Sequence, residues 1–142
     1  MVEADGSGEP EADAAEVAEL QELWGGHKPG GPLVGIGSVK GNLGHCFTAG
    51  AAAGLVKAAL SLHRRVLAPQ VAPARPLESL SRLDSSVYLL DRPRPWITGD
   101  PASPRRAAVL GANFDPVCPV GTASKSGRVA AIILEEEPED RT

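Results

Sequence analysis

The sequence is poor in aromatic residues, and this scarcity limits the kind of core that its 142 residues can build. Only 4% of the residues are Phe, Trp or Tyr, whereas 42% are hydrophobic. The core must therefore consist of Ala, Val, Leu and Ile, whose small side chains let backbones approach closely. A chain of this length is one ordinary domain or a piece of a larger one.

Three further scarcities exclude whole classes of protein. Two cysteines, Cys46 and Cys118, do not make a disulfide framework, which predicts reduced thiols in a cytoplasmic protein. Basic residues number 14 against 18 acidic ones, and this balance argues against a nucleic-acid partner. The longest apolar run ends at Lys57 and is far shorter than the ~20 residues of a membrane span, and the acidic N-terminus shows no signal peptide.

Strand-like and helix-like segments alternate along the chain, which predicts a layered α/β architecture. The periodicity of apolar residues predicts strands at 2–4, 33–39, 87–90, 107–112 and 128–134, and helices at 9–24 and about 46–65.

The second of these helices is apolar nearly all round, as in Ala53, Leu55, Val56 and Leu60, and this pattern is typical of a buried helix. The rest of the chain offers too few partners to cover it. We therefore expect the missing cover to come from another polypeptide segment.

Three motifs occur in order along the chain. The first is VEADGSGEP at 2–10, and the second is GSVKGNLGH at 37–45, with the Ala/Gly-rich helix behind it. The third combines RPW at 94–96, PRRAAV at 104–109 and ILEE at 133–136.

Together these motifs resemble the C-terminal part of a β-ketoacyl synthase (ketosynthase) domain of a polyketide or polyunsaturated-fatty-acid synthase, of a degenerate or chain-length-factor-like kind. The resemblance covers almost the whole chain, and its second block is the most specific. It implies a thiolase-like α/β fold, layered α-β-α around a buried Ala-rich helix. Residues 1–134 would form the C-terminal portion of that domain, and 135–142 an acidic flexible tail.

The same resemblance implies a chemistry for three positions. In active ketosynthases a cysteine thiolate holds the acyl chain, a malonyl thioester on a carrier protein loses carbon dioxide, and two histidines donate hydrogen bonds to the enolate oxygen. The second histidine falls on His45, the family's lysine on Lys40, and the first histidine on Asp5. The nucleophilic cysteine would lie outside this chain. The implied carrier is the phosphopantetheine arm of an acyl carrier protein, and no other cofactor is expected.

Asp5 is the most informative departure from the family pattern. An imidazole donates a hydrogen bond, whereas an ionised carboxylate only accepts and would repel an enolate. Removing one such donor typically lowers the rate by ~10²–10³. A second departure is the loop GANFDPVCP at 111–119, because two prolines stiffen a segment that is Gly-rich in active members.

Three hypotheses follow. The first is a non-condensing ketosynthase-like module that scaffolds a dimer and helps to shape the acyl pocket of a partner. The second is the C-terminal half of an active decarboxylating and condensing enzyme, and the third is a small interaction protein derived from that fold. The partners that the first two imply are the N-terminal half of the domain, a ketosynthase-like dimer partner and an acyl carrier protein.

Simpler interpretations of the same residues remain open. His45 alone could cap a helix, and Lys40 alone would be a solvated loop residue; only the intact motif around them favours an inherited active site. Cys46 adjoins His45, but adjacent residues at a helix start diverge, which favours a structural thiol over a nucleophile pair. The glycines that begin at Gly35 do not have dinucleotide-loop spacing, and the His and Cys residues do not have metal-ligand spacing.

Overall fold

The computed structural model describes residues 1–24, 33–81, 83, 86–100, 102–113 and 128–137. The elements follow one another as β1 (Val2–Glu3), α1 (Pro10–Trp24), β2 (Val34–Gly37), α2 (Lys40–Leu43), the 3₁₀ turn η1 (Phe47–Ala49), α3 (Gly50–Arg64), β3 (Val66–Leu67), α4 (Glu78–Ser81), β4 (Val87–Leu89), β5 (Arg94–Pro95), β6 (Arg106–Asn113) and β7 (Arg128–Glu135).

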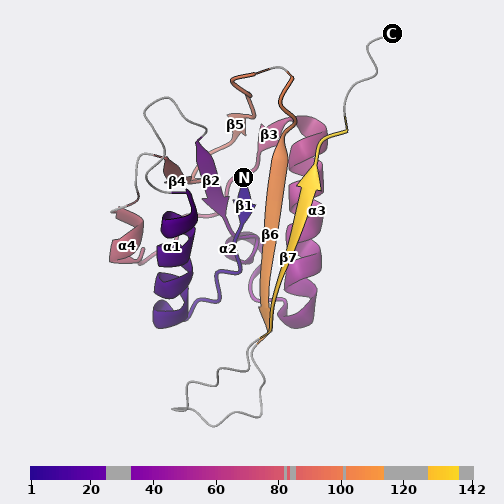
Figure 1. Ribbon diagram of the computed structural model, residues 1–142. Coiled ribbons are helices and arrows are strands. Elements are labelled where there is room, and N and C mark those ends of the chain that lie inside the picture. The colour runs from indigo at the N-terminus through magenta and orange to yellow at the C-terminus, as the bar shows by residue number, and fades with distance from the viewer. Residues whose placement is uncertain (25–32, 82, 84–85, 101, 114–127, 138–142) are drawn as a thin grey trace.

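A five-stranded sheet organises the molecule, in the order β4-β2-β1-β6-β7 (Figure 1). The pairs β4-β2, β2-β1 and β1-β6 are parallel, and β7 runs antiparallel to β6 along eight residue pairs. The two-residue strand β1 is therefore the centre of the sheet, and it leads directly into Asp5. Strands β3 and β5 form a separate antiparallel pair.

Helices cover the two faces of this sheet, because successive strand residues point to opposite sides. On one face Leu20 of α1 packs with Val2, Ile36 and Val87. On the other face the buried side of α3 packs against β6, with a second cluster made of Ala58, Leu62, Ala107 and Val109. Figure 1 shows α1 and α3 on opposite sides of the sheet, so the α-β-α layering that the sequence predicted is confirmed.

The observed boundaries lie close to the expected ones, with two differences. Residues 40–43, which carry Gly and Asn and suggested a turn, form the single helical turn α2, in which the Leu43 and Gly44 N–H groups donate to the Val39 and Lys40 carbonyls. The last strand also extends one residue beyond its expected end: Glu135 is the last residue of β7, and Glu136 forms ion pairs with Arg65 and Arg105. Residues 138–142 lie outside the described part of the chain.

The helix α3 is buried along one face only, which agrees with the expectation that this chain offers too few partners to cover it. Gly50, Gly54, Ala58, Ser61 and Leu62 form its buried face. The opposite face exposes apolar side chains, among them Phe47 in the preceding turn (82% exposed), Val56 (57%) and Leu60 (54%). The physical reason is that the described residues supply a sheet for one side of α3 and no layer for the other.

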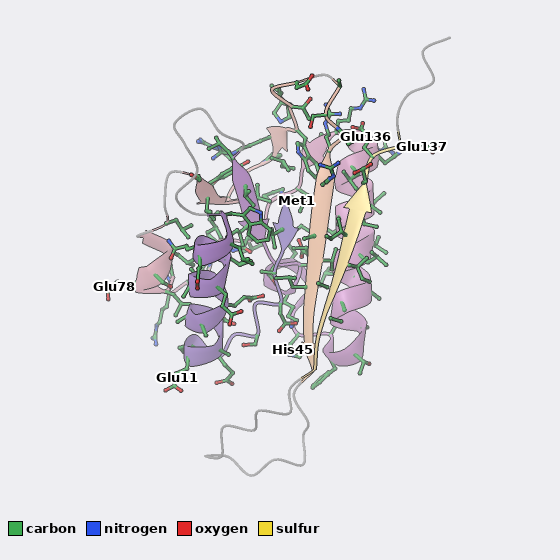
Figure 2. All side chains as sticks on the ribbon, viewed as in Figure 1. Met1, Glu11, His45, Glu78, Glu136 and Glu137 are labelled. Atoms are coloured by element: carbon green, nitrogen blue, oxygen red, sulfur yellow. The ribbon has the colours of Figure 1, made fainter. Side chains whose placement is uncertain are left out.

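Among the helices of the described residues, none combines the length and the apolar character needed to cross a membrane. Figure 2 shows the side chains on the same view and places His45 and Glu136 at opposite ends of the molecule.

Candidate functional site

The loop that carries Asp5 is fastened to α1 by two carboxylates. Glu16 accepts hydrogen bonds from the Asp5 and Gly6 N–H groups at 2.8 and 3.0 Å. Asp13 accepts them from the N–H groups of Ser7 and Gly8 at 2.7 and 3.0 Å. Four consecutive backbone donors are thus held by one helix, which fixes the position of residue 5.

Gly6 is required at the sharpest point of this loop. Its φ is +53°, a conformation that side chains disfavour, and an added Cβ would lie 2.8 Å from the Ser38 hydroxyl oxygen. The close approach has a use: the Ser38 hydroxyl donates to the Asp5 carbonyl at 3.1 Å, so the first and second motifs are joined here.

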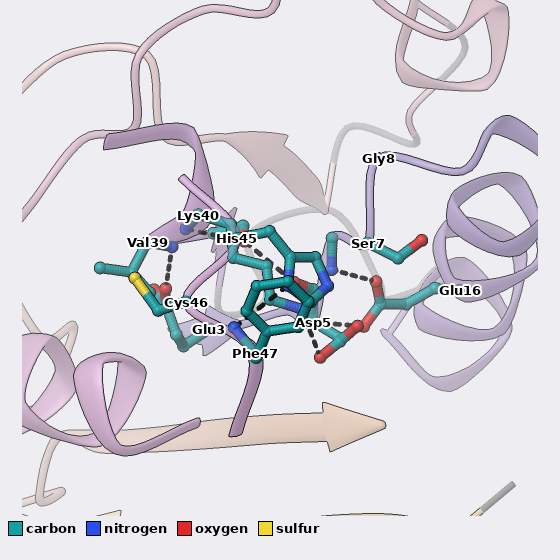
Figure 3. A network of polar contacts seen from close by, with 12 residues as sticks. Glu3, Asp5, Ser7, Gly8, Glu16, Val39, Lys40, His45, Cys46 and Phe47 are labelled. Carbon is teal, nitrogen blue, oxygen red and sulfur yellow. Dashed lines mark hydrogen bonds and ion pairs between the residues drawn. The ribbon is translucent and has the colours of Figure 1, made fainter. Parts of the chain in front are cut away.

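The turn that carries Lys40 is fixed in the same way from outside the motif. The Ser38 N–H donates to the Gln70 side-chain oxygen at 2.6 Å, and the Val39 N–H donates to the Glu3 carboxylate. Lys40 then opens α2 with its side chain directed toward β1 (Figure 3).

These two fixed segments bring Lys40 and Asp5 together. The Lys40 ammonium lies 2.8 Å from the Asp5 Oδ1 atom, and the two side chains are only 12% and 14% exposed. A salt bridge removed from water to this extent keeps both members in place, because breaking it would leave a largely buried charge without compensation. Residue 5 thus presents an anion already engaged by a cation.

A second ion pair lies close to the first, because Glu3 accepts the N–H of Val39, the residue before Lys40. Glu3 Oε2 is 2.8 Å from the Lys57 ammonium, with side-chain exposures of 2% and 10%. Burial raises the pKa of Glu3, and the hydrogen bonds and charge from Lys57 and Val39 oppose that rise. Three members of these pairs line one small pocket, namely Glu3, Asp5 and Lys40. The other residues around it are Ala4, Val39, Gly50, Ala51, Gly54 and Leu110.

The contacts of His45 are with Phe47 rather than with these ion pairs. Its side chain is exposed, its Nδ1 atom accepts the Phe47 N–H at 3.2 Å, and its ring meets the Phe47 ring edge to face at 5.2 Å between centroids. Of the three positions named from the sequence, the structure therefore joins Asp5 and Lys40 through a salt bridge, and it joins His45 to Phe47. Cys46 is half-buried, and its thiol contacts the Gly44 carbonyl at 3.5 Å.

Sequence reasoning missed the residues that support the site, namely Glu3, Asp13, Glu16, Gln70 and Lys57. One signal was available: Lys57 interrupts the apolar run of the helix between Gly50 and Leu60, and a cation in such a place needs a buried counter-charge. The loop at 111–119 lies mostly outside the described residues. Within those residues, His, Cys, Asp and Glu side chains form no cluster suited to a metal ion.

Comparison with known proteins identifies the fold and the motifs. The family described as "Beta-ketoacyl synthase, C-terminal domain" matches residues 1–73, which is just over half of the chain. The chain belongs to the β-ketoacyl synthase family. The resemblance inferred from the motifs is therefore confirmed, and the match includes both the Asp5 loop and the block from Lys40 to His45.

The curated relatives of this ketosynthase segment are polyketide synthases. It is 34% identical over 137 residues to the spectinabilin polyketide synthase system protein NorA' of Streptomyces orinoci, covering 96% of this chain and 3% of that protein. It is 36% identical over 109 residues to a mycocerosic acid synthase-like polyketide synthase of Mycobacterium tuberculosis, covering 77% and 5% respectively. The chain thus spans only a few per cent of the length of these relatives.

Solved ketosynthase structures share the fold. The ketosynthase from module 6 of the bacillaene synthase of Bacillus subtilis 168 superposes with a TM-score of 0.77 at 30% identity, covering 96% of this chain and 22% of that one. Ketosynthase twelve from the bacillaene polyketide synthase of Bacillus amyloliquefaciens gives a TM-score of 0.76, also at 30% identity, over 96% and 22%. This chain corresponds to somewhat less than a quarter of each, which supports its assignment as the C-terminal part of a ketosynthase domain.

Proposed function

We propose that the polyketide-synthase ketosynthase domain containing this chain does not condense acyl groups and acts as a chain-length-factor-like scaffold and acyl-pocket partner. The observation that carries the proposal is the Asp5–Lys40 salt bridge of 2.8 Å. It lies where the family resemblance puts a hydrogen-bond-donating histidine.

The electrostatics of this pair disfavour the reaction. An enolate oxygen that forms from a malonyl thioester needs donors already aimed at it. The Asp5 carboxylate has none to offer, and it also occupies the Lys40 ammonium that would otherwise present positive charge. Because Glu16 holds the Asp5 backbone at 2.8 Å, the carboxylate has little freedom to leave the corner.

The test is decarboxylation by the full-length protein supplied with malonyl thioester on its acyl carrier protein. We expect carbon dioxide release from the unaltered protein to stay at background. Asp5→His should raise it by about 10²–10³-fold, the usual contribution of one such donor. Asp5→Leu is the matched control, since it removes the negative charge without placing any hydrogen-bond donor in the corner.

Two outcomes contradict the proposal. Carbon dioxide release by the unaltered protein well above background would show an active site, as would release that depends on His45 while Asp5 is unchanged. Release by Asp5→Leu above background and equal to that of Asp5→His would show that repulsion, rather than the missing donor, silences the site.

The exposed apolar face of α3 supports the partner that the proposal requires. We propose that the remainder of the ketosynthase domain covers Phe47, Val56 and Leu60, and that the complete domain pairs with a dimer partner and receives an acyl carrier protein. Leu60→Asp should then prevent co-purification with a separately expressed N-terminal half of the domain. Leu23→Asp is the matched control, because Leu23 is also exposed but lies on α1. Equal retention of both variants would contradict the assignment.

A further inference from the structure

The proposed function makes no use of the most deeply buried ion pair, Glu3–Lys57. The two side chains come from β1 and α3, lie 2.8 Å apart, and are 2% and 10% exposed. Burying such a pair costs desolvation energy, so its presence is weak evidence that it stabilises the fold. We therefore ask whether the pair fixes the local geometry instead.

Two glycines make room for the pair. A Cβ added to Gly54 in α3 would lie 3.0 Å from Glu3 Cγ, and one added to Gly37 in β2 would lie 3.2 Å from the Lys57 ammonium. The sequence thus leaves a side chain out at two positions that approach the pair closely, one beside each charged residue.

Glu3 also connects the two segments that carry the candidate site. It precedes Asp5 by two residues in β1 and the loop that follows. Its second oxygen, Oε1, accepts the N–H of Val39, the residue before Lys40. A single carboxylate is therefore bonded to the backbone next to Lys40 while it belongs to the strand that leads into Asp5 (Figure 3).

We infer that Glu3 is a positioning residue, whose carboxylate holds the Val39 N–H and so places Lys40 against Asp5, while Lys57 supplies the counter-charge that keeps the carboxylate there. The inference rests on the proposed function only in treating the Asp5–Lys40 salt bridge as the feature that prevents condensation. Its readout is the chemical accessibility of Lys40 rather than carbon dioxide release, so the two can fail separately.

The experiment compares two neutral replacements of the pair in the full-length protein. Glu3→Gln with Lys57→Met keeps an oxygen that accepts from Val39, whereas Glu3→Leu with Lys57→Met keeps the shape and loses the acceptor. Buried ion pairs replaced by apolar residues of similar volume often leave stability unchanged, so both variants are expected to fold. Glu136→Gln is the control, since it removes an ion-paired carboxylate at the end of the molecule opposite His45 (Figure 2).

Two measurements on each variant report the position of Lys40: its acylation rate by a water-soluble anhydride, and deuterium exchange of the peptide around Val39, both followed by mass spectrometry. We expect the variant without an acceptor to acylate Lys40 about fivefold faster, the factor that corresponds to one lost hydrogen bond. The Gln-containing variant and the Glu136→Gln control should stay close to the unaltered protein.

Equal Lys40 acylation in the two double variants would overturn the inference, because a purely structural pair does not depend on an oxygen acceptor. Should the Leu-containing variant fail to fold, Val39→Pro removes the same N–H while leaving both charges, and the φ of −64° at this position suits proline. Unchanged Lys40 acylation in folded Val39→Pro would overturn the inference as well.

Discussion

Two ion pairs of nearly the same length lie in very different surroundings, one at the polar centre of the molecule and one at the end of the β6-β7 pair. In the middle of α3, Lys57 meets Glu3 of β1 at 2.8 Å with both side chains almost fully buried. Between the first residue of β6 and the last residue of β7, Arg106 meets Glu135 at 2.6 Å with exposures of 59% and 50%. Judged by distance alone, the second pair would be the stronger interaction.

Burial makes the first pair the more important one for stability. Exposed pairs gain little, because water screens both charges before they meet. A buried pair contributes little net stability when intact, yet removing one member leaves an uncompensated charge in a medium of low dielectric constant. The comparison teaches that the sensitive part of this molecule is the polar centre around β1, although arginines and glutamates are more numerous at the other end.

The largest expected effect is the loss of one buried charge. Lys57→Met should lower the free energy of unfolding by about 3–5 kcal/mol at neutral pH, because Glu3 is left buried without its counter-charge. Glu135→Gln, which breaks the exposed pair, should change it by less than about 1 kcal/mol. Urea unfolding of both variants checks the contrast. Equal losses of unfolding free energy would show that burial does not distinguish the two ion pairs.

A smaller effect is expected from filling the space beside the buried pair. Gly54→Ala places a Cβ 3.0 Å from Glu3 Cγ and 3.4 Å from Val109 Cγ1. Overpacking costs about 1–3 kcal/mol, and the better helix propensity of alanine returns about 1 kcal/mol. A net loss of about 1 kcal/mol should appear in urea unfolding. Gly99→Ala is the control, since its added Cβ would meet no atom within 4 Å; a stabilised Gly54→Ala variant would mean that Glu3 gives way.

The smallest expected effect is a difference in sign between the pH dependence of the stability that Glu16 contributes and that of Glu136. Burial raises the pKa of Glu16 above its ordinary 4.5, so the stability that its protonation contributes is present below 4.5 and lost as the pH rises through the raised pKa. Hydrogen bonding from Arg105 lowers the pKa of Glu136, so its contribution is present above 4.5 and lost as the pH falls through the lowered pKa.

Urea unfolding at a series of pH values separates these two groups. Glu16→Gln should flatten the decline of stability above pH 4.5, and Glu136→Gln should flatten the rise toward pH 4.5 from the acid side. If both substitutions change the same limb of the curve, the two ends of the molecule do not differ electrostatically in the way described.

The order of the elements was predictable because apolar periodicity and glycine-containing turns mark them in the sequence. The helix α1 and the strands β2, β4 and β6 lie within a few residues of their expected bounds. The single turn of α2 was not predictable, because its Gly41 and Asn42 favour turns and its stability comes from tertiary contacts of Ser38 and Val39.

The site was predictable only as far as a motif could be matched position by position. Asp5 and Lys40 were found in this way, and their salt bridge follows from the parallel pairing of β1 with β2, which no local pattern reveals. Glu3 and Lys57 are 54 residues apart in the sequence, so only the folded chain shows that they meet. The sequence also indicated that this chain could not cover α3 completely, and one face of α3 is exposed. The apolar pattern alone does not say which segment covers that face.

The strand β7 has a practical consequence for anyone who prepares this chain alone. It forms the outer margin of the sheet, pairs with β6 on one side, and presents Ile132 and Ile133 with 48% and 73% of their surface exposed. A long apolar margin strand is a template for strand addition by neighbouring molecules, which begins aggregation. Lysine substitutions at these two isoleucines would act as gatekeepers and would keep concentrated samples monodisperse.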